Sequence, residues 1–127
     1  MSALETVESI YAAFGRGDAG FIIGLVAPGA SWRQPATLPW GGNFIGPEGA
    51  GDFFTRLNMH FETTGFQIRE NIVAGDRVIS LGRYEGNSRK TGKFAGGDFC
   101  FIWQIRDGKI ADYEAHLDSA AYVAAMN

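Results

Sequence analysis

Hydrophobic residues in the first half of the chain recur every three or four positions, which is the spacing of helices that bury one face. The first such segment covers residues 3–14, and Ser2 with Glu5 gives it a capping-box start. Two more segments with helical features cover residues 19–26 and 48–61. The pattern therefore predicts three helices in the first half of the chain.

Strand-like segments dominate the second half, and one shorter strand is expected earlier, over residues 30–35. Asp107-Gly108 is a strong signal for a tight turn between two strands. A final short helix is expected over residues 119–126. The order α-α-β-α-β-β-β-β-α predicts an α+β fold with helices packed on one face of a curved antiparallel sheet. The later strands are expected at residues 65–75, 77–87, 94–106 and 109–118.

Length and composition indicate one globular domain over residues 1–127, with 46% hydrophobic and 20% charged residues. The formal net charge is -3 and no cluster of Lys or Arg is present, which argues against a nucleic-acid partner. No apolar stretch reaches the roughly 18 residues of a membrane span. The first residues lack the basic and apolar regions of a signal peptide. We therefore expect a cytoplasmic protein with no membrane partner.

Metal and thiol chemistry receive no support from the sequence. His60 and His116 are far apart and have no matching set of ligands, so we expect no metal and no cofactor. Cys100 has no second cysteine with which to form a disulfide. Its neighbours Phe99 and Phe101 indicate a buried, reduced thiol.

Three motifs, in order along the chain, resemble one known superfamily. They are "YAAFGRGD" in the first helix, "FIGPEGAGDFF" at the start of the third, and "IWQIRDGKIADYEAHLD" in the last two strands. The chain resembles the nuclear transport factor 2-like superfamily, and within it the branch of SnoaL-like polyketide cyclases and ketosteroid isomerases. The resemblance implies a cystatin-like cone, in which helices close the concave face of a curved antiparallel sheet.

The resemblance also implies positions for catalytic acids and bases, and other residue types occupy them here. Gln34 stands where the isomerases carry their general base, and an amide does not accept a proton at neutral pH. Phe101 stands near the position of their protonated Asp, and Ala115 at that of the cyclases' acid. Tyr11 is one residue past the position of the isomerases' oxyanion-binding Tyr, which falls at Ile10. The usual isomerase and cyclase mechanisms are therefore not supported.

An aromatic set is expected to line the interior of the cone. Side chains alternate along a strand, so Phe99, Phe101 and Trp103 share one face, which the resemblance places inside. Aromatic walls with a few hydrogen-bonding groups suit a small, mostly apolar or polycyclic molecule. The ligand-binding residues expected are Tyr11, Trp32, Gln34, Trp40, Phe53, Tyr84, Phe99, Phe101, Trp103 and Tyr113.

The same residues also have a purely structural interpretation, because inward-facing Phe and Trp residues commonly fill a core. For Phe53 the core interpretation is favoured. Trp40 lies in a loop with Pro39, Gly41 and Gly42, and no predicted helix or strand is available for it to pack on. Two roles stay open for Trp40: a lid or a residue at the mouth of the pocket, or a dimer contact.

His116 and Asp118 are the alternative catalytic candidates. They share one face of the last strand, about 6.5 Å apart along the backbone. An Asp that orients a His forms a general base that works near neutral pH. A β-bulge after Tyr113 would turn the pair toward the cavity. Without a bulge they face outward, in an interface, with Asp118 free to cap the last helix.

Two functions follow from the sequence and both stay open. One is a cofactor-independent enzyme, with isomerase, cyclase or hydrolase chemistry, acting on a hydrophobic metabolite. The other is a non-enzymatic module that binds a small hydrophobic molecule or forms a dimeric interaction surface. The outer face of the sheet is expected to mediate a homodimer, because it is too apolar for a free surface. Its apolar residues are Ile79, Leu81, Cys100 and Ile102.

Overall fold

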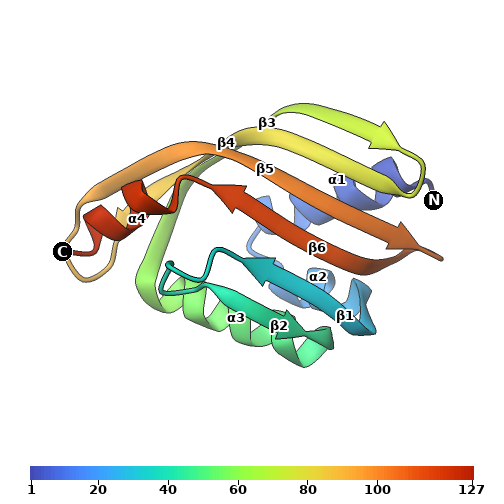
Figure 1. Ribbon diagram of the computed structural model, residues 1–127, viewed down its shortest axis with the longest axis horizontal. Helices are drawn as coiled ribbons and strands as arrows, with labels where there is room; N and C mark the ends of the chain where they lie inside the picture. Colours follow the sequence, from blue (N-terminus) through green and yellow to red (C-terminus); the bar gives the residue numbers. More distant parts are fainter.

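The computed structural model describes all 127 residues, which form four helices and one six-stranded sheet (Figure 1). None of the four helices is long and apolar enough to cross a membrane. The elements are α1 (Ala3–Gly15), α2 (Ala19–Leu25), β1 (Val26–Gln34), β2 (Gly42–Ile45), α3 (Gly46–His60), β3 (Phe61–Ala74), β4 (Arg77–Ser88), β5 (Phe94–Arg106), β6 (Lys109–Leu117) and α4 (Ser119–Ala125).

The strands lie in the order β2-β1-β6-β5-β4-β3. All neighbouring strands are antiparallel except β1 and β6, which are parallel. The sheet curves over α1, α2 and α3, and α4 lies at the end of the sheet where the chain terminates (Figure 1). The predicted α+β class, with helices covering the concave face, is therefore confirmed.

The local signals at the first helix and the last hairpin act as expected. The Ser2 hydroxyl accepts a hydrogen bond from the backbone N–H of Glu5 at 3.1 Å, and the Glu5 carboxylate accepts one from the Ser2 N–H at 3.0 Å. This is the reciprocal capping box. Asp107 and Gly108 both have positive φ angles, 51° and 72°, as a tight hairpin turn with right-handed twist requires.

The main differences from the prediction in the first half are an extra strand, β2, and earlier starts for β1 and β3; β3 begins at Phe61 and not at residue 65. The strand β2 was not expected, because its four residues carry no alternating pattern and it forms by pairing with β1, where Trp32 lies opposite Phe44. The strand β1 begins at Val26, four residues before the expected start. Pairing with neighbouring strands produces these features, and the pattern of a single sequence does not reveal such pairing.

The alternation predicted for β5 is confirmed. Phe99, Phe101 and Trp103 are buried on the concave face, together with Ile105. The intervening residues face outward and are half-buried, and Cys100 is one of them. The expectation of a buried thiol was therefore wrong, because burial of both phenylalanine neighbours turns Cys100 to the other face of the sheet.

Candidate functional site

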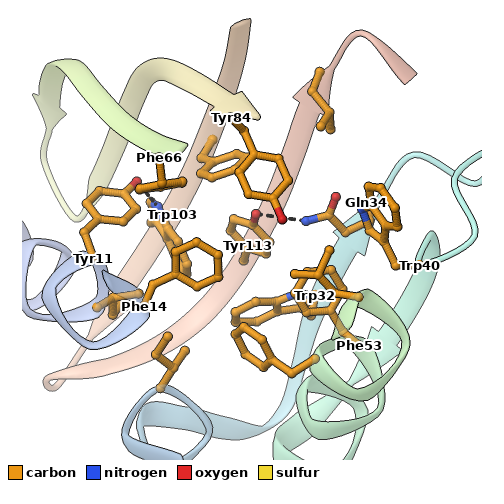
Figure 2. A pocket seen from close by; sticks show the side chains of 16 residues that line it. Tyr11, Phe14, Trp32, Gln34, Trp40, Phe53, Phe66, Tyr84, Trp103 and Tyr113 are labelled. Atoms are coloured by element: carbon orange, nitrogen blue, oxygen red, sulfur yellow. Dashed lines mark hydrogen bonds between the residues drawn. The ribbon is translucent and has the colours of Figure 1, made fainter. Parts of the chain in front are cut away.

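An apolar cavity lies between the concave face of the sheet and helices α1, α2 and α3 (Figure 2). Sixteen residues line it, and all but Gln34 are hydrophobic. The wall contains no His, Asp, Glu, Lys or Arg. The strands supply the polar end near Gln34 and Tyr113, and Tyr11, Phe14 and Phe66 lie at the opposite end, near α1 (Figure 2).

The cavity is narrow. Its volume is about 60 Å³. An apolar cavity of about 150 Å³ holds benzene. A single aromatic ring therefore enters this cavity only if some wall side chains move outward by a small amount.

Phe14, Phe54 and Phe66 separate the cavity from a larger groove at the surface, because all three line both spaces. The groove has a polar wall, which includes Asp18 before α2 and residues at the start of β3 such as Glu62. Phe14 and Phe66 are half-buried and their ring centroids lie 5.0 Å apart. This pair of rings marks the side of the cavity that is closest to solvent.

Nine of the ten residues predicted to bind a ligand line this cavity. They come from α1, β1, the segment between β1 and β2, α3, β4, β5 and β6, so the fold brings together side chains that are far apart in the sequence. The nine are Tyr11, Trp32, Gln34, Trp40, Phe53, Tyr84, Phe101, Trp103 and Tyr113.

Most of the polar side chains in the wall have a hydrogen-bond partner. Gln34 Nε2 donates a hydrogen bond to the Tyr113 hydroxyl at 3.0 Å, and both residues are buried. Trp103 Nε1 donates to the Tyr11 hydroxyl at 2.8 Å. The hydroxyl of Tyr84 shares a hydrogen bond of 2.6 Å with that of Thr63. These pairs orient the aromatic rings around the cavity.

Burial keeps the wall tyrosines neutral. Desolvation raises the pKa of Tyr11 to about 12, and it raises the pKa values of Tyr84 and Tyr113 well above the ordinary value for tyrosine. At neutral pH these hydroxyls therefore act as hydrogen-bond donors and acceptors. None of them is a proton acceptor with a pKa near 7, the range that a general base needs.

Trp32 is the exception to this pairing. Its side chain is 2% exposed, and its indole Nε1 has no hydrogen-bond partner in the protein. The ring packs against Tyr113 and Phe53, with centroid distances of 4.3 and 5.5 Å. A buried donor without an acceptor is uncommon in folded proteins and calls for an explanation.

The family model of the SnoaL-like domain matches residues 7–113. The chain belongs to the SnoaL-like domain family. No curated protein matches it. Among solved structures it is similar to an NTF2-like protein from Burkholderia thailandensis, with 29% identity, coverage of 100% of this chain and 98% of that chain, and a TM-score of 0.92.

Two further structures resemble this SnoaL-like domain over nearly its whole length. One is an NTF2-like protein of unknown function from Burkholderia pseudomallei, with 26% identity, coverage of 100% and 99%, and a TM-score of 0.91. The other is TerC co-crystallised with polyporic acid, with 27% identity, coverage of 98% and 97%, and a TM-score of 0.86. The comparisons therefore support the resemblance to the SnoaL-like branch of the nuclear transport factor 2-like (NTF2-like) superfamily.

Phe99 is the one predicted ligand-binding residue of the SnoaL-like domain that does not line the cavity. Its ring stacks on Phe101 with a centroid distance of 3.9 Å and on Phe66 at 5.3 Å. It also covers Gly82 on the neighbouring strand, where a Cβ atom would lie 2.6 Å from the ring. Phe99 thus fills the core over a glycine, although it shares a face with Phe101.

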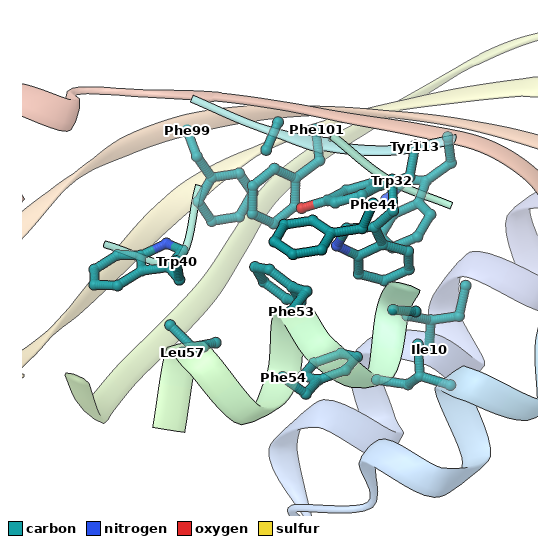
Figure 3. Packing of buried hydrophobic residues seen from close by; sticks show 14 of the residues in the cluster. Ile10, Trp32, Trp40, Phe44, Phe53, Phe54, Leu57, Phe99, Phe101 and Tyr113 are labelled. Atoms are coloured by element: carbon teal, nitrogen blue, oxygen red, sulfur yellow. The ribbon is translucent and has the colours of Figure 1, made fainter. Parts of the chain in front are cut away.

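Trp40 is part of the core, not an exposed lid or a dimer contact, since its side chain is 1% exposed. Its ring lies 5.2 Å from that of Phe61 and 6.1 Å from that of Tyr122 in α4, measured between centroids. Figure 3 shows Trp40 within the buried cluster, beside Leu57 of α3. Trp40 still contributes to the cavity wall.

His116 and Asp118 lie outside the cavity of the SnoaL-like domain. The His116 side chain is 62% exposed, and its Nε2 lies 3.6 Å from a carboxylate oxygen of Glu114. The Asp118 carboxylate accepts a hydrogen bond from the N–H of Ala121 and caps α4. The register of β5 and β6 shifts before Tyr113 and not after it, so no bulge turns this pair inward.

The positions where the resemblance implied acids lie on the concave side. Gln34 and Phe101 line the cavity, and Ala115 is buried nearby without forming part of its wall. In the whole chain, no group of three or more His, Cys, Asp or Glu side chains is arranged to hold a metal ion.

Seven further residues line the cavity without having been named as ligand-binding residues. Phe14 follows Tyr11 by three positions, so helical spacing places the two residues on the same face of α1. Phe66 lies opposite Tyr84 in the register of β3 and β4, a pairing that the sequence alone does not reveal. The seven are Ile10, Phe14, Ile22, Phe54, Leu57, Phe66 and Leu117.

Proposed function

We propose that this SnoaL-like domain binds a small, mostly apolar organic molecule in the cavity between the sheet and the helices. The observation that carries the proposal is the wall itself, in which fifteen of sixteen residues are hydrophobic and no residue carries a charge. Such a wall favours apolar surface and disfavours an ion, because an unpaired charge buried there would lose its hydration. The co-crystal of TerC with polyporic acid supports a small-molecule role for this fold.

The size of the cavity favours a single ring over a polycyclic molecule. The cavity volume is only about 60 Å³. A polycyclic metabolite would require Phe14 and Phe66 to move aside, whereas one ring needs smaller shifts. These two half-buried side chains border the surface groove, so they are the ones that a larger ligand would displace.

Binding without chemistry is the function that the geometry supports best. Isomerase, cyclase or hydrolase chemistry in this cavity would have to rely on hydrogen bonds from Gln34 and Tyr113, because the wall holds no group that takes up a proton near neutral pH. His116 cannot assist from its present position on the outer face. A binding module is consistent with all of these features.

Adjacent residues on β6 provide a matched test. Leu117 lines the cavity, whereas His116 faces away from it. Calorimetric titration with toluene is expected to show binding to the unmodified protein and to His116→Trp, and at least tenfold weaker binding to Leu117→Trp. Urea unfolding of both variants shows whether each is folded. The proposal fails if the unmodified protein does not bind toluene, or if folded Leu117→Trp binds it as tightly as His116→Trp does.

We also propose that the outer face of the sheet pairs with a second copy of the chain. Charges of both signs border its half-buried apolar centre. On one side Arg33 lies 2.8 Å from Asp112, and on the other Arg83 lies 3.1 Å from Glu85. Such a border can complement itself across a twofold axis. Sedimentation at micromolar concentration is expected to show a dimer that Ile102→Asp dissociates, and a monomeric unmodified protein would overturn this proposal.

A further inference from the structure

Trp32, a residue of the cavity wall, carries a fully buried indole N–H for which the protein provides no acceptor. Trp32 lies in the middle of β1, between Phe44 on β2 and Tyr113 on β6, so both neighbouring strands fix its position. Its side chain is 2% exposed. Water outside the fold therefore does not reach this N–H group.

The other tryptophan on the sheet provides a contrast. Trp103 also lines the cavity and is 3% exposed, but its Nε1 donates to the Tyr11 hydroxyl at 2.8 Å. The fold thus satisfies one of these two buried indoles and leaves the other unpaired. Since buried donors are almost always paired, the unpaired one points to an acceptor that comes from outside the chain.

A second donor lies beside Trp32. The only hydrogen bond of the Tyr113 hydroxyl is the one that it accepts from Gln34, so its own hydrogen is free to be donated. The raised pKa of Tyr113 keeps that hydrogen in place at neutral pH. The rings of Trp32 and Tyr113 are in contact, with centroids 4.3 Å apart, so the two donors belong to neighbouring parts of the wall.

The charge of the wall decides which acceptor fits. A carboxylate would accept from both donors, but the wall has no Lys or Arg to balance its charge, and burial of an unpaired ion is costly. A carbonyl oxygen accepts hydrogen bonds and carries no charge. The rest of such a ligand would contact aromatic rings, as an aromatic ketone or aldehyde does.

We propose that Trp32 Nε1 donates a hydrogen bond to the carbonyl oxygen of the bound molecule, and that neutral aromatic ketones or aldehydes are the ligand class of this cavity. The inference rests on the proposed binding function, since it requires a molecule in the cavity. It goes beyond that function by naming the group that the ligand must carry and the residue that recognises it.

Two probes of the same shape test the proposal. Acetophenone carries a C=O group where α-methylstyrene carries C=CH₂, so only the first can accept a hydrogen bond. The unmodified protein is expected to bind acetophenone about threefold to tenfold more tightly, the range of one net hydrogen bond. Trp32→Phe is expected to bring this ratio close to one. Trp103→Phe removes an indole that already has a partner, so it is expected to weaken both probes and to keep the ratio.

A measurement on the unmodified protein complements the variants. The three indole N–H resonances in a ¹⁵N-correlated spectrum report on the three tryptophans separately. The Trp32 resonance is expected to move downfield on addition of acetophenone and to move much less with α-methylstyrene. If both probes bind equally and this resonance responds equally to both, the role of Trp32 is overturned and the binding function stands. If neither probe binds, both the role of Trp32 and the binding function are overturned.

Discussion

The buried pair of Gln34 and Tyr113 allows a quantitative test of how the cavity is built. Their side chains are 9% and 3% exposed, and one hydrogen bond of 3.0 Å joins them. Tyr113→Phe removes the acceptor and leaves the Gln34 amide in an apolar wall. Gln34→Leu leaves the Tyr113 hydroxyl equally unpaired. The double variant removes both polar groups together.

The expected free energies follow from this geometry. An unpaired buried polar group costs about 1–3 kcal/mol, so each single substitution is expected to lower the free energy of unfolding by that amount. Replacement of both partners by apolar groups of similar shape is close to neutral. The double variant is therefore expected to be less destabilised than the sum of the two single variants, by about 2–6 kcal/mol.

Urea unfolding of the four proteins measures this coupling, provided that the dependence on urea concentration is the same for all. Gln104→Leu is the matched control, because Gln104 lies on the outer face of β5 and bonds Asp76 at an exposed site. Combined with Tyr113→Phe it is expected to be additive. If the Gln34 and Tyr113 effects are also additive within about 0.5 kcal/mol, the pair does not organise the wall and the reasoning is refuted.

Four further predictions concern the fold and the site. Burial raises the pKa values of all four tyrosines, so the folded chain is expected to become less stable relative to the unfolded chain as pH rises above about 10. Absorbance at 295 nm should show tyrosine ionisation mainly above pH 11, and ionisation centred at pH 10 would contradict this. Gly82→Ala is expected to lower the midpoint of thermal unfolding, because its Cβ would meet the Phe99 ring and a backbone oxygen. Gly24→Ala has open space in a helix and is expected to raise that midpoint. Equal effects of the two substitutions would refute the argument. Trp40→Ala should cost about 3–5 kcal/mol in urea unfolding, and a cost below about 1 kcal/mol would contradict its place in the core. His116→Ala should leave toluene affinity unchanged between pH 5.5 and 8, and a loss of affinity would restore His116 as a site residue.

Much of the cone could be predicted because its strands obey a period of two. The alternation along β5 and β6 placed Phe101, Trp103 and Tyr113 inside and His116 outside, and it is confirmed. This alternation left the role of His116 open only because a β-bulge after Tyr113 would have turned its side chain toward the cavity. The structure has its register shift elsewhere, which a single sequence does not show.

The features that could not be predicted depend on contacts between distant segments. Trp40 has no periodic neighbours, and it is buried because Tyr122 and Phe61 come from elements much later in the chain. The strand β2 exists through its pairing with β1. Phe99 shares a face with Phe101 but packs over Gly82. The alternation of side chains along the strand therefore predicts on which face of the sheet Phe99 lies, but not how far it lies from the cavity.

The central claim is that the aromatic cavity holds a small apolar molecule, and a crystal structure with bromobenzene tests it most directly. The anomalous signal of bromine locates the probe independently of how the protein is interpreted. The account predicts one strong peak between the sheet and α3, among Trp32, Phe53 and Tyr113, with small outward shifts of the wall. A peak only on the outer face or in the surface groove, or no peak at saturating probe, would contradict it.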